Sequence, residues 1–248
     1  NERVLDDKNN EFLNLLNEGS KEDKVYVIPL GGLEEIGKNA ALIQYKDEMV
    51  LVDAGLAFPN DDMLGVDIVI RDYSKLIRNE NKLKAVLLTH GHEDHIGSLT
   101  YLYKNLVNKN IPIYSSKFTL GLVKEKMKTL RKGSFEFNEV SSRSKIKLGE
   151  YFEIEFISIT HSIPDSFCLA INTPVGTILH TGDFKFDLTP IDGKMTDFYK
   201  LAEKGEKGVL MLMADSTNSM KEEFTPSEKE VGKSFERFFR DSYGRIII

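Results

Sequence analysis

The chain of 248 residues has a single cysteine, Cys168, and no long apolar run. One cysteine excludes a disulfide framework and a cysteine-based zinc finger, and it is typical of a reducing compartment. No apolar run approaches the roughly 18 residues that a transmembrane helix requires, and residues 1–20 are too polar for the core of a signal peptide. These absences predict a cytoplasmic protein with no membrane partner.

The composition is that of a folded protein. Apolar side chains make up 41% of the chain and charged side chains 29%, which excludes a disordered tail and leaves enough apolar material for a sizeable core. At roughly 150 residues per domain, the length predicts one large domain, or one domain plus part of another.

The charge is unevenly distributed along the chain. The formal net charge of −6 argues against a partner held by bulk attraction to phosphate. Residues 101–150, however, contain eleven lysines and arginines against four glutamates. Such a run is most often a solvated helix face, and the alternative is an edge that faces a polyanion.

Short apolar runs separated by glycine-containing or charged turns dominate residues 24–52. The runs VYVIPL, ALIQY and MVLVD predict three strands in rapid succession, a β-meander. A further strand, AVLLT, leads through a glycine-containing loop into a helical pattern at Leu99, Leu102 and Leu106. After it, strands at IPIY, FEIEFISI, SFCLAI, TILHTG and VLMLMAD alternate with a helix predicted over 116–131. The mixture predicts an α/β fold in which helices cover the sheets.

Both ends of the chain differ from this body. Residues 1–22 have leucines and a phenylalanine at near-helical spacing, which predicts a short amphipathic arm. Near the C-terminus, Pro226 and Ser227 predict the start of a helix that runs to about Tyr243. Residues 245–248 have the pattern of the beginning of a buried strand with nothing after it, so the sequence looks truncated.

Three of the five histidines lie within six residues. His90, His92 and His95 occur in THGHEDHIG, directly after a predicted strand, and Asp94 lies among them. Histidines at i and i+2 leaving a strand project the same way, so His90 and His92 can bind one metal ion. Asp94 and His95 come where the chain turns into a helix expected to begin near Ile96, and they can face a second metal ion.

Two more candidate ligands follow predicted strands. His161 comes after FEIEFISIT, and Asp183 comes after TILHT. In a layered α/β fold, strand ends on one side of a sheet form the floor of a site, so both side chains can reach the histidine cluster. His180, three residues before Asp183, is interpreted as a residue behind the ligands. The sequence therefore predicts a dinuclear metal site.

These motifs, together with Asp53 in LVDAG, resemble the metallo-β-lactamase superfamily. The segments PLGGLEEIGKN, DAGLAFP, LGVDIVI, HTGDFKFD, ADSTNS and FTPSE more closely resemble the ribonuclease J family of its β-CASP branch. The resemblance implies an α/β metallo-β-lactamase fold, an αβ/βα four-layer sandwich truncated at the start of the β-CASP insertion. It divides the chain into an N-terminal arm (1–22), the N-terminal part of the metallo-β-lactamase domain (23–218) and the beginning of the β-CASP domain (219–248).

The resemblance also implies an activity and residue roles. We expect a ribonuclease with endonuclease and 5′-to-3′ exonuclease activity that uses a metal-activated water. The expected metal ligands are His90, His92, Asp94, His95, His161 and Asp183. Of these, Asp94, His95 and Asp183 are expected to be catalytic. Three further residues are expected to contact the metal ligands without binding metal themselves: Asp53, His180 and Asp215. Lys124, Lys128 and Arg131 are the expected contacts with RNA, and the full-length family tends towards dimers and tetramers.

Three points stay open in the sequence. Imidazole ligands favour zinc, while carboxylates also suit manganese. A hydrolase of the same fold that acts on a thioester, lactam or lactone is the second enzymatic hypothesis, and weak salt dependence would favour it. The third hypothesis is an RNA-binding or assembly subunit with an incomplete metal site, because the resemblance implies a further histidine ligand after residue 248.

Overall fold

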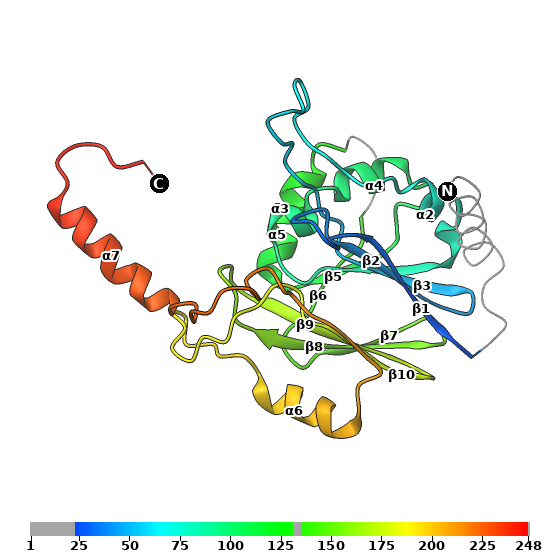
Figure 1. The fold of residues 1–248 in the computed structure, drawn as a ribbon. Coiled ribbons are helices and arrows are strands. Elements are labelled where there is room, and N and C mark those ends of the chain that lie inside the picture. The colour runs from blue at the N-terminus through cyan, green and yellow to red at the C-terminus, as the bar shows by residue number, and fades with distance from the viewer. Residues whose placement is uncertain (1–22, 131–134, 248) are drawn as a thin grey trace.

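Two β-sheets form the centre of the protein (Figure 1). A computed structural model describes residues 23–130 and 135–247, and the predicted arm at 1–22 lies outside these described residues. In chain order the elements are β1 Val25–Gly31, β2 Ala40–Tyr45, β3 Glu48–Val52, α2 Ser74–Arg78, a 3₁₀ helix Glu80–Lys82, β4 Leu83–Leu87, α3 Glu93–Ile96, α4 Leu99–Asn105, β5 Ile113–Ser115, α5 Lys117–Met127, β6 Phe137–Glu139, β7 Lys145–Leu148, β8 Phe152–Ile159, β9 Ser166–Thr173, β10 Gly176–His180, α6 Phe198–Lys207, β11 Met211–Met213 and α7 Glu228–Asp241.

The first sheet has the strand order β1-β2-β3-β4-β5-β6. Strands β1, β2 and β3 pair antiparallel, which confirms the predicted meander. From β3 to β6 the strands are parallel, with α4 and α5 on the connections. Parallel strands buried on both faces require continuous apolar runs, and β3 and β4 have them.

The second sheet has the strand order β11-β10-β9-β8-β7. Its pairs are antiparallel from β7 to β10, and β11 joins β10 in parallel. β11 and β7 are the two edge strands, and Met211 and Leu212 on β11 are exposed.

Four layers result from the way the two sheets and the helices pack. The inner faces of the sheets meet in a core that joins Val52 and Leu87 of the first sheet to Phe156 and Leu169 of the second. The outer face of the first sheet packs against α2, α4 and α5, and Leu201 of α6 packs on the outer face of the second (Figure 1). The expected αβ/βα sandwich is confirmed.

The C-terminal segment agrees with the sequence in one part and differs in another. The helix expected from Ser227 to about Tyr243 is present as α7, and Ser227 is its N-cap. The strand expected at 245–248 is wrong for the described residues 245–247, which are exposed coil. A strand needs a partner for its backbone groups, and none of the described strands pairs with this segment. Within 23–130 and 135–247, no helix is long and apolar enough to cross a bilayer.

Candidate metal centre

The ends of β3 and β4 deliver the first group of site residues. These strands are parallel neighbours, so their carboxyl ends meet at the same edge of the sheet. Asp53 follows β3 and Thr89 follows β4, and the Asp53 carboxylate accepts hydrogen bonds from the backbone N and the hydroxyl of Thr89, both at 2.8 Å. His90 therefore leaves the sheet at a fixed point beside Asp53.

Backbone hydrogen bonds fix the short helix α3, which contains Asp94 and His95. Asn39 N donates to Asp94 O at 3.0 Å, and Ala54 N donates to His95 O at 2.8 Å. Gly55 lies so close to the helix that a Cβ added there would be 1.5 Å from Asp94 O. Glycine is therefore required at position 55, and the loop after β3 is held to α3 as one unit.

Helix α3 starts earlier than the sequence predicts. It begins at Glu93 rather than near Ile96, so Asp94 and His95 lie within the helix. His92 is the N-cap, and its carbonyl accepts a hydrogen bond from Ile96 N at 2.9 Å. Acidic side chains in a first turn favour the helix N-terminus, which is the physical reason for the early start at Glu93 and Asp94.

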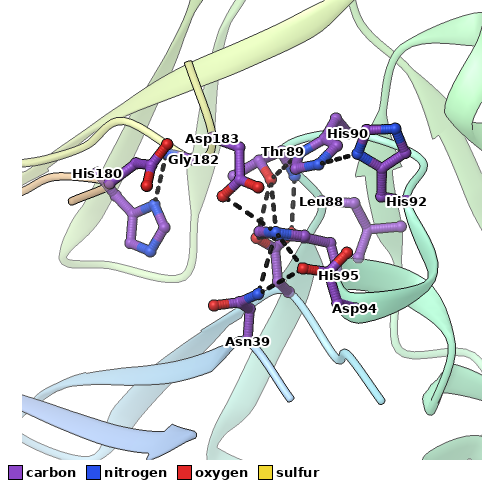
Figure 2. Close-up of polar contacts among 12 residues, drawn as sticks. Asn39, Leu88, Thr89, His90, His92, Asp94, His95, His180, Gly182 and Asp183 are labelled. Atoms are coloured by element: carbon purple, nitrogen blue, oxygen red, sulfur yellow. Dashed lines mark hydrogen bonds and ion pairs between the residues drawn. The ribbon is translucent and has the colours of Figure 1, made fainter. Parts of the chain in front are cut away.

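Three imidazoles converge on one point. His92 Nδ1 lies 3.1 Å from His90 Nε2 (Figure 2) and 3.1 Å from His161 Nε2. Two nitrogens that bind one tetrahedral Zn²⁺ at about 2.0–2.1 Å are separated by about 3.3 Å. The observed spacing fits a shared metal ion, and His161 reaches this group from the end of β8.

A second group of donors lies beside the first. Ligand atoms of His90, His95 and Asp183 lie within 4.8 Å of one another. His95 Nε2 is 3.2 Å from Asp183 Oδ1, and the other oxygen of Asp183 is 3.9 Å from His161 Nε2. Asp183 therefore faces both groups. Asp94 lies at the edge of the second group, with Oδ2 3.5 Å from His95 Nε2.

The histidines differ in charge. Burial lowers the pKa of His161 to about 4 and holds the pKa of His90 well below its usual range. Both are therefore neutral at pH 7, which is the form of imidazole that binds metal ions. Burial acts to lower the pKa of His95 as well, but the carboxylates of Asp53 and Asp183 outweigh it and raise the pKa to about 10. These two carboxylates therefore favour a cation beside His95.

Sequence reasoning missed two residues, Thr89 and Asn39. The Thr89 hydroxyl donates to Asp53 and lies 3.0 Å from His90 Nδ1. Asn39 Nδ2 donates to Asp94 Oδ2 at 3.1 Å (Figure 2). Thr89 directly precedes the histidine motif, which is a usable signal. Asn39 is separated from Asp94 by 55 positions, so only the fold brings it to the site.

The three residues expected to contact the metal ligands differ from one another in their relation to the cluster. Asp53 Oδ2 lies 2.8 Å from His95 Nδ1, and both side chains are buried, which is the arrangement of a carboxylate that orients a ligand imidazole. His180 Nδ1 accepts a hydrogen bond from Gly182 N at 3.1 Å, and its ring lies apart from the cluster (Figure 2). Asp215 is half-buried and lines a cavity beside the cluster. The contact with His95 makes Asp53 the strongest of the three candidates.

Two of the three residues expected to contact RNA lie at the C-terminal end of α5. Lys124 is exposed on this helix, Lys128 is its exposed C-cap residue, and Arg131 lies outside the described residues. Lys126 of the same helix pairs with Glu93 of α3 at 2.6 Å. The basic helix therefore runs directly beside the candidate metal centre.

A four-layer αβ/βα sandwich whose strand ends gather histidines and aspartates defines a class of α/β protein that could hold divalent metal. Residues 34–247 match the Metallo-beta-lactamase superfamily, and the chain belongs to this superfamily. Two solved structures share the fold. A protein of unknown function from Enterococcus faecalis V583 has a TM-score of 0.61 at 20% identity, covering 87% of this chain and 57% of that one. The metallo-beta-lactamase fold protein YhfI from Bacillus subtilis has a TM-score of 0.50 at 22% identity, covering 68% and 66%.

Curated relatives make the resemblance more specific. The chain is 46% identical over 235 residues to Ribonuclease J from Thermus thermophilus, which covers 93% of this chain and 41% of the relative. It is 48% identical over 226 residues to Ribonuclease J from Synechocystis sp., which covers 90% of this chain and 34% of the relative. The resemblance to ribonuclease J is thus confirmed. The chain spans about two fifths or less of the length of these relatives.

Proposed function

We propose that this chain is the catalytic part of a metal-dependent ribonuclease that hydrolyses RNA phosphodiesters by endonucleolytic and 5′-to-3′ exonucleolytic cleavage in RNA processing and decay. One observation supports this most directly. Two donor groups meet at Asp183, in a chain of which about nine tenths aligns with proteins named Ribonuclease J. No side-chain nucleophile is required for such a reaction.

The proposed mechanism assigns one task to each residue. Two divalent metal ions would supply a water of lowered pKa and positive charge opposite the phosphodiester. His90, His92 and His161 would present neutral nitrogen donors on one side. Asp183, which faces both groups, would fix their spacing, and His95 would complete the second group.

Two further carboxylates complete the proposed mechanism. Asp53 would hold His95 through Nδ1, and this would direct Nε2 of His95 towards Asp183. Asp94, held by Asn39, would act at the edge of the second group and place a proton acceptor near the substrate. Asp215 would help to move a proton at the wall of the adjoining cavity.

The proposal includes cofactors, partners and domain organisation. Zinc suits the imidazoles and manganese suits the carboxylates, so either ion is a candidate. RNA is the proposed partner, in the cytoplasm, and a dimer or tetramer is the proposed state at full length. Residues 23–218 would form the first part of the metallo-β-lactamase domain, and 219–248 would begin a β-CASP domain.

Cleavage of a 5′-labelled, 5′-monophosphorylated RNA tests this function. The protein at its natural full length should degrade the RNA with manganese or zinc, and Asp183→Asn should lower the rate at least about 100-fold because a charge between the two groups is lost. Asp61→Asn, an exposed position on another loop, is the matched control and should retain activity. If the full-length protein is inert towards RNA with both metals but active on a thioester or lactam, the nuclease proposal is wrong and the protein is a small-molecule hydrolase.

A further inference from the structure

A cavity of about 850 Å³ adjoins the candidate metal centre. His161 and Asp183 form the part of its wall that belongs to the centre, and Asp215 lies on the same wall. The rest of the wall is rich in aromatic rings and in short polar side chains. The phenylalanines that line it are Phe184, Phe186, Phe198 and Phe224, and the short polar residues are Ser162, Ser216, Thr217, Asn218, Ser219 and Thr225. A substrate at the metal centre would extend into this cavity.

Phe186 is the most exposed member of a row of three rings. Its ring centroid lies 5.1 Å from that of Phe184 and 5.2 Å from that of Phe198. Phe184 packs against the apolar cluster on the outer face of the second sheet, and Phe198 begins α6. Phe186 itself is 60% exposed. Its neighbours therefore support the ring while it remains open to solvent.

The backbone on both sides of Phe186 is fixed to Thr160. Lys185 N donates to Thr160 O at 2.9 Å, and Asp187 N donates to the Thr160 hydroxyl at 3.3 Å. Thr160 directly precedes His161, and Phe186 follows Asp183 by three residues. The position of the ring is thus tied through short chain segments to two residues of the metal centre.

Charge argues against a phosphate-binding role for this wall. Among the residues that line the cavity, Lys185 is the only lysine or arginine, and its ammonium is paired with Glu228. Asp183, Asp215 and Glu223 add negative charge to the same wall. The side chains of this wall therefore offer an RNA little attraction by cations, and its exposed phenylalanine rings offer base stacking instead.

We propose that Phe186 is a stacking platform for one unpaired nucleobase next to the phosphodiester at the metal centre, so that this face selects single-stranded RNA without selecting sequence. The proposal rests on the proposed nuclease function. Stacking on an aromatic face is available to every base and requires that the base be unpaired. A base paired in a duplex would present its edge rather than its face to such a ring.

The first experiment measures binding, so that it does not depend on cleavage. Full-length protein silenced by Asp183→Asn is titrated with a labelled single-stranded RNA, and fluorescence anisotropy gives the Kd. Phe186→Leu keeps the apolar bulk and removes the π face, so Kd should rise about tenfold, whereas Phe186→Trp should bind as tightly as the parent. Phe58→Leu, on a loop outside the cavity and 68% exposed, should leave Kd unchanged.

The second experiment locates the base. An abasic nucleotide is moved one position at a time through the RNA, and Kd is measured with and without Phe186→Leu. At one position the abasic site should weaken the parent about tenfold, and Phe186→Leu should add no further loss. Additive losses at every position would overturn the platform. So would an unchanged Kd with a lowered Tm for Phe186→Leu, because the ring would then be covered by another part of the full-length protein.

These results separate the two proposals. If the parent protein does not cleave RNA but Phe186 still couples to one base, the nuclease proposal is rejected and the stacking proposal stands. Cleavage of RNA with no coupling at any position would keep the nuclease and reject the platform.

Discussion

The two sides of the candidate metal centre are held in different ways. On the β3–β4 side, backbone hydrogen bonds from Asn39 and Ala54 fix the helix that contains His95, whose side chain is 2% exposed. On the β8–β10 side, His161 and Asp183 leave strand ends, and their side chains are 17% and 28% exposed. We call the β3–β4 side the rigid side, because backbone hydrogen bonds hold its helix, and the β8–β10 side the open side, because both of its ligands are more exposed than His95.

The packing behind each side explains this difference. The outer face of the first sheet is covered by a large apolar cluster that draws on α2, α4 and α5. The corresponding cluster of the second sheet is small and is covered by α6, while Met211 and Leu212 on the edge strand β11 are exposed. The ligands on the first sheet are therefore backed by more buried apolar contact than those on the second.

The largest expected effect comes from breaking the rigid side at Gly55. Alanine there would place its Cβ 1.5 Å from Asp94 O, so α3 must move away from the β3 loop. We expect Gly55→Ala to lower the free energy of unfolding by about 3 kcal/mol. Displacement of a catalytic group by about 1 Å costs about 100-fold in rate, so activity should fall at least that far. Urea unfolding and RNA cleavage measure the two effects.

Gly121→Ala is the matched control for this substitution. Gly121 lies inside α5, and a Cβ added there meets nothing within 4 Å. Alanine in a helix interior is favoured over glycine by roughly 0.5–1 kcal/mol, so this variant should be slightly more stable and fully active. Equal losses for the two variants would show that α3 is not held by close contact at Gly55.

Replacing one carboxylate on each side sharpens the comparison. Asp53 on the rigid side holds His95 Nδ1 at 2.8 Å, and Asp53→Asn keeps the bond from Thr89 N while removing the charge. Loss of such a partner costs about 10- to 100-fold in metal affinity. Asp215 on the open side lines the cavity, and Asp215→Asn should change metal affinity less than about threefold.

Metal affinity for this pair of variants is read by competition with a chelator of known affinity. Circular dichroism of both variants serves as the control, because a misfolded protein would also lose metal. A larger loss for Asp215→Asn than for Asp53→Asn would contradict the division into a rigid and an open side, and would place Asp215 among the groups that hold metal.

Sequence alone predicted the elements whose signal is local. Apolar runs between turns gave most of the strands, and Pro226 with Ser227 gave the start of α7. Helix α6 was not predicted, because it buries only part of Leu201 and contacts the sheet through Lys204, which pairs with Glu155 at 2.6 Å. A buried lysine conceals the apolar periodicity that identifies a helix.

The site shows the same division between local and distant signals. His90, His92 and His95 stood out by spacing, and the end of β4 brings them together as a group. The hydrogen bond from Asn39 to Asp94 could not be predicted, because it depends on the packing of a turn after β1 against α3. Spacing identifies candidate ligands, and the fold identifies the groups that orient them.

The smallest expected effect concerns the basic helix on the rigid side. Lys124 on α5 and Lys128 at its C-cap are exposed, and this helix is tied to α3 by the pair of Lys126 with Glu93. Replacing Lys124 and Lys128 together with glutamine should weaken single-stranded RNA binding about threefold near 100 mM salt, and should flatten the slope of log K against log salt by about 1.4, because two phosphate contacts are lost.

Lys207→Gln with Lys233→Gln is the matched control for the basic helix, since both lysines are exposed and paired with a glutamate on α6 and α7. This control should leave the salt slope unchanged, because these helices lie away from α5 (Figure 1). An equal change in slope for both pairs would mean that RNA responds to net charge alone. A slope unaffected by the α5 pair would make this helix a solvated face, and would leave the binding of substrate to the open side.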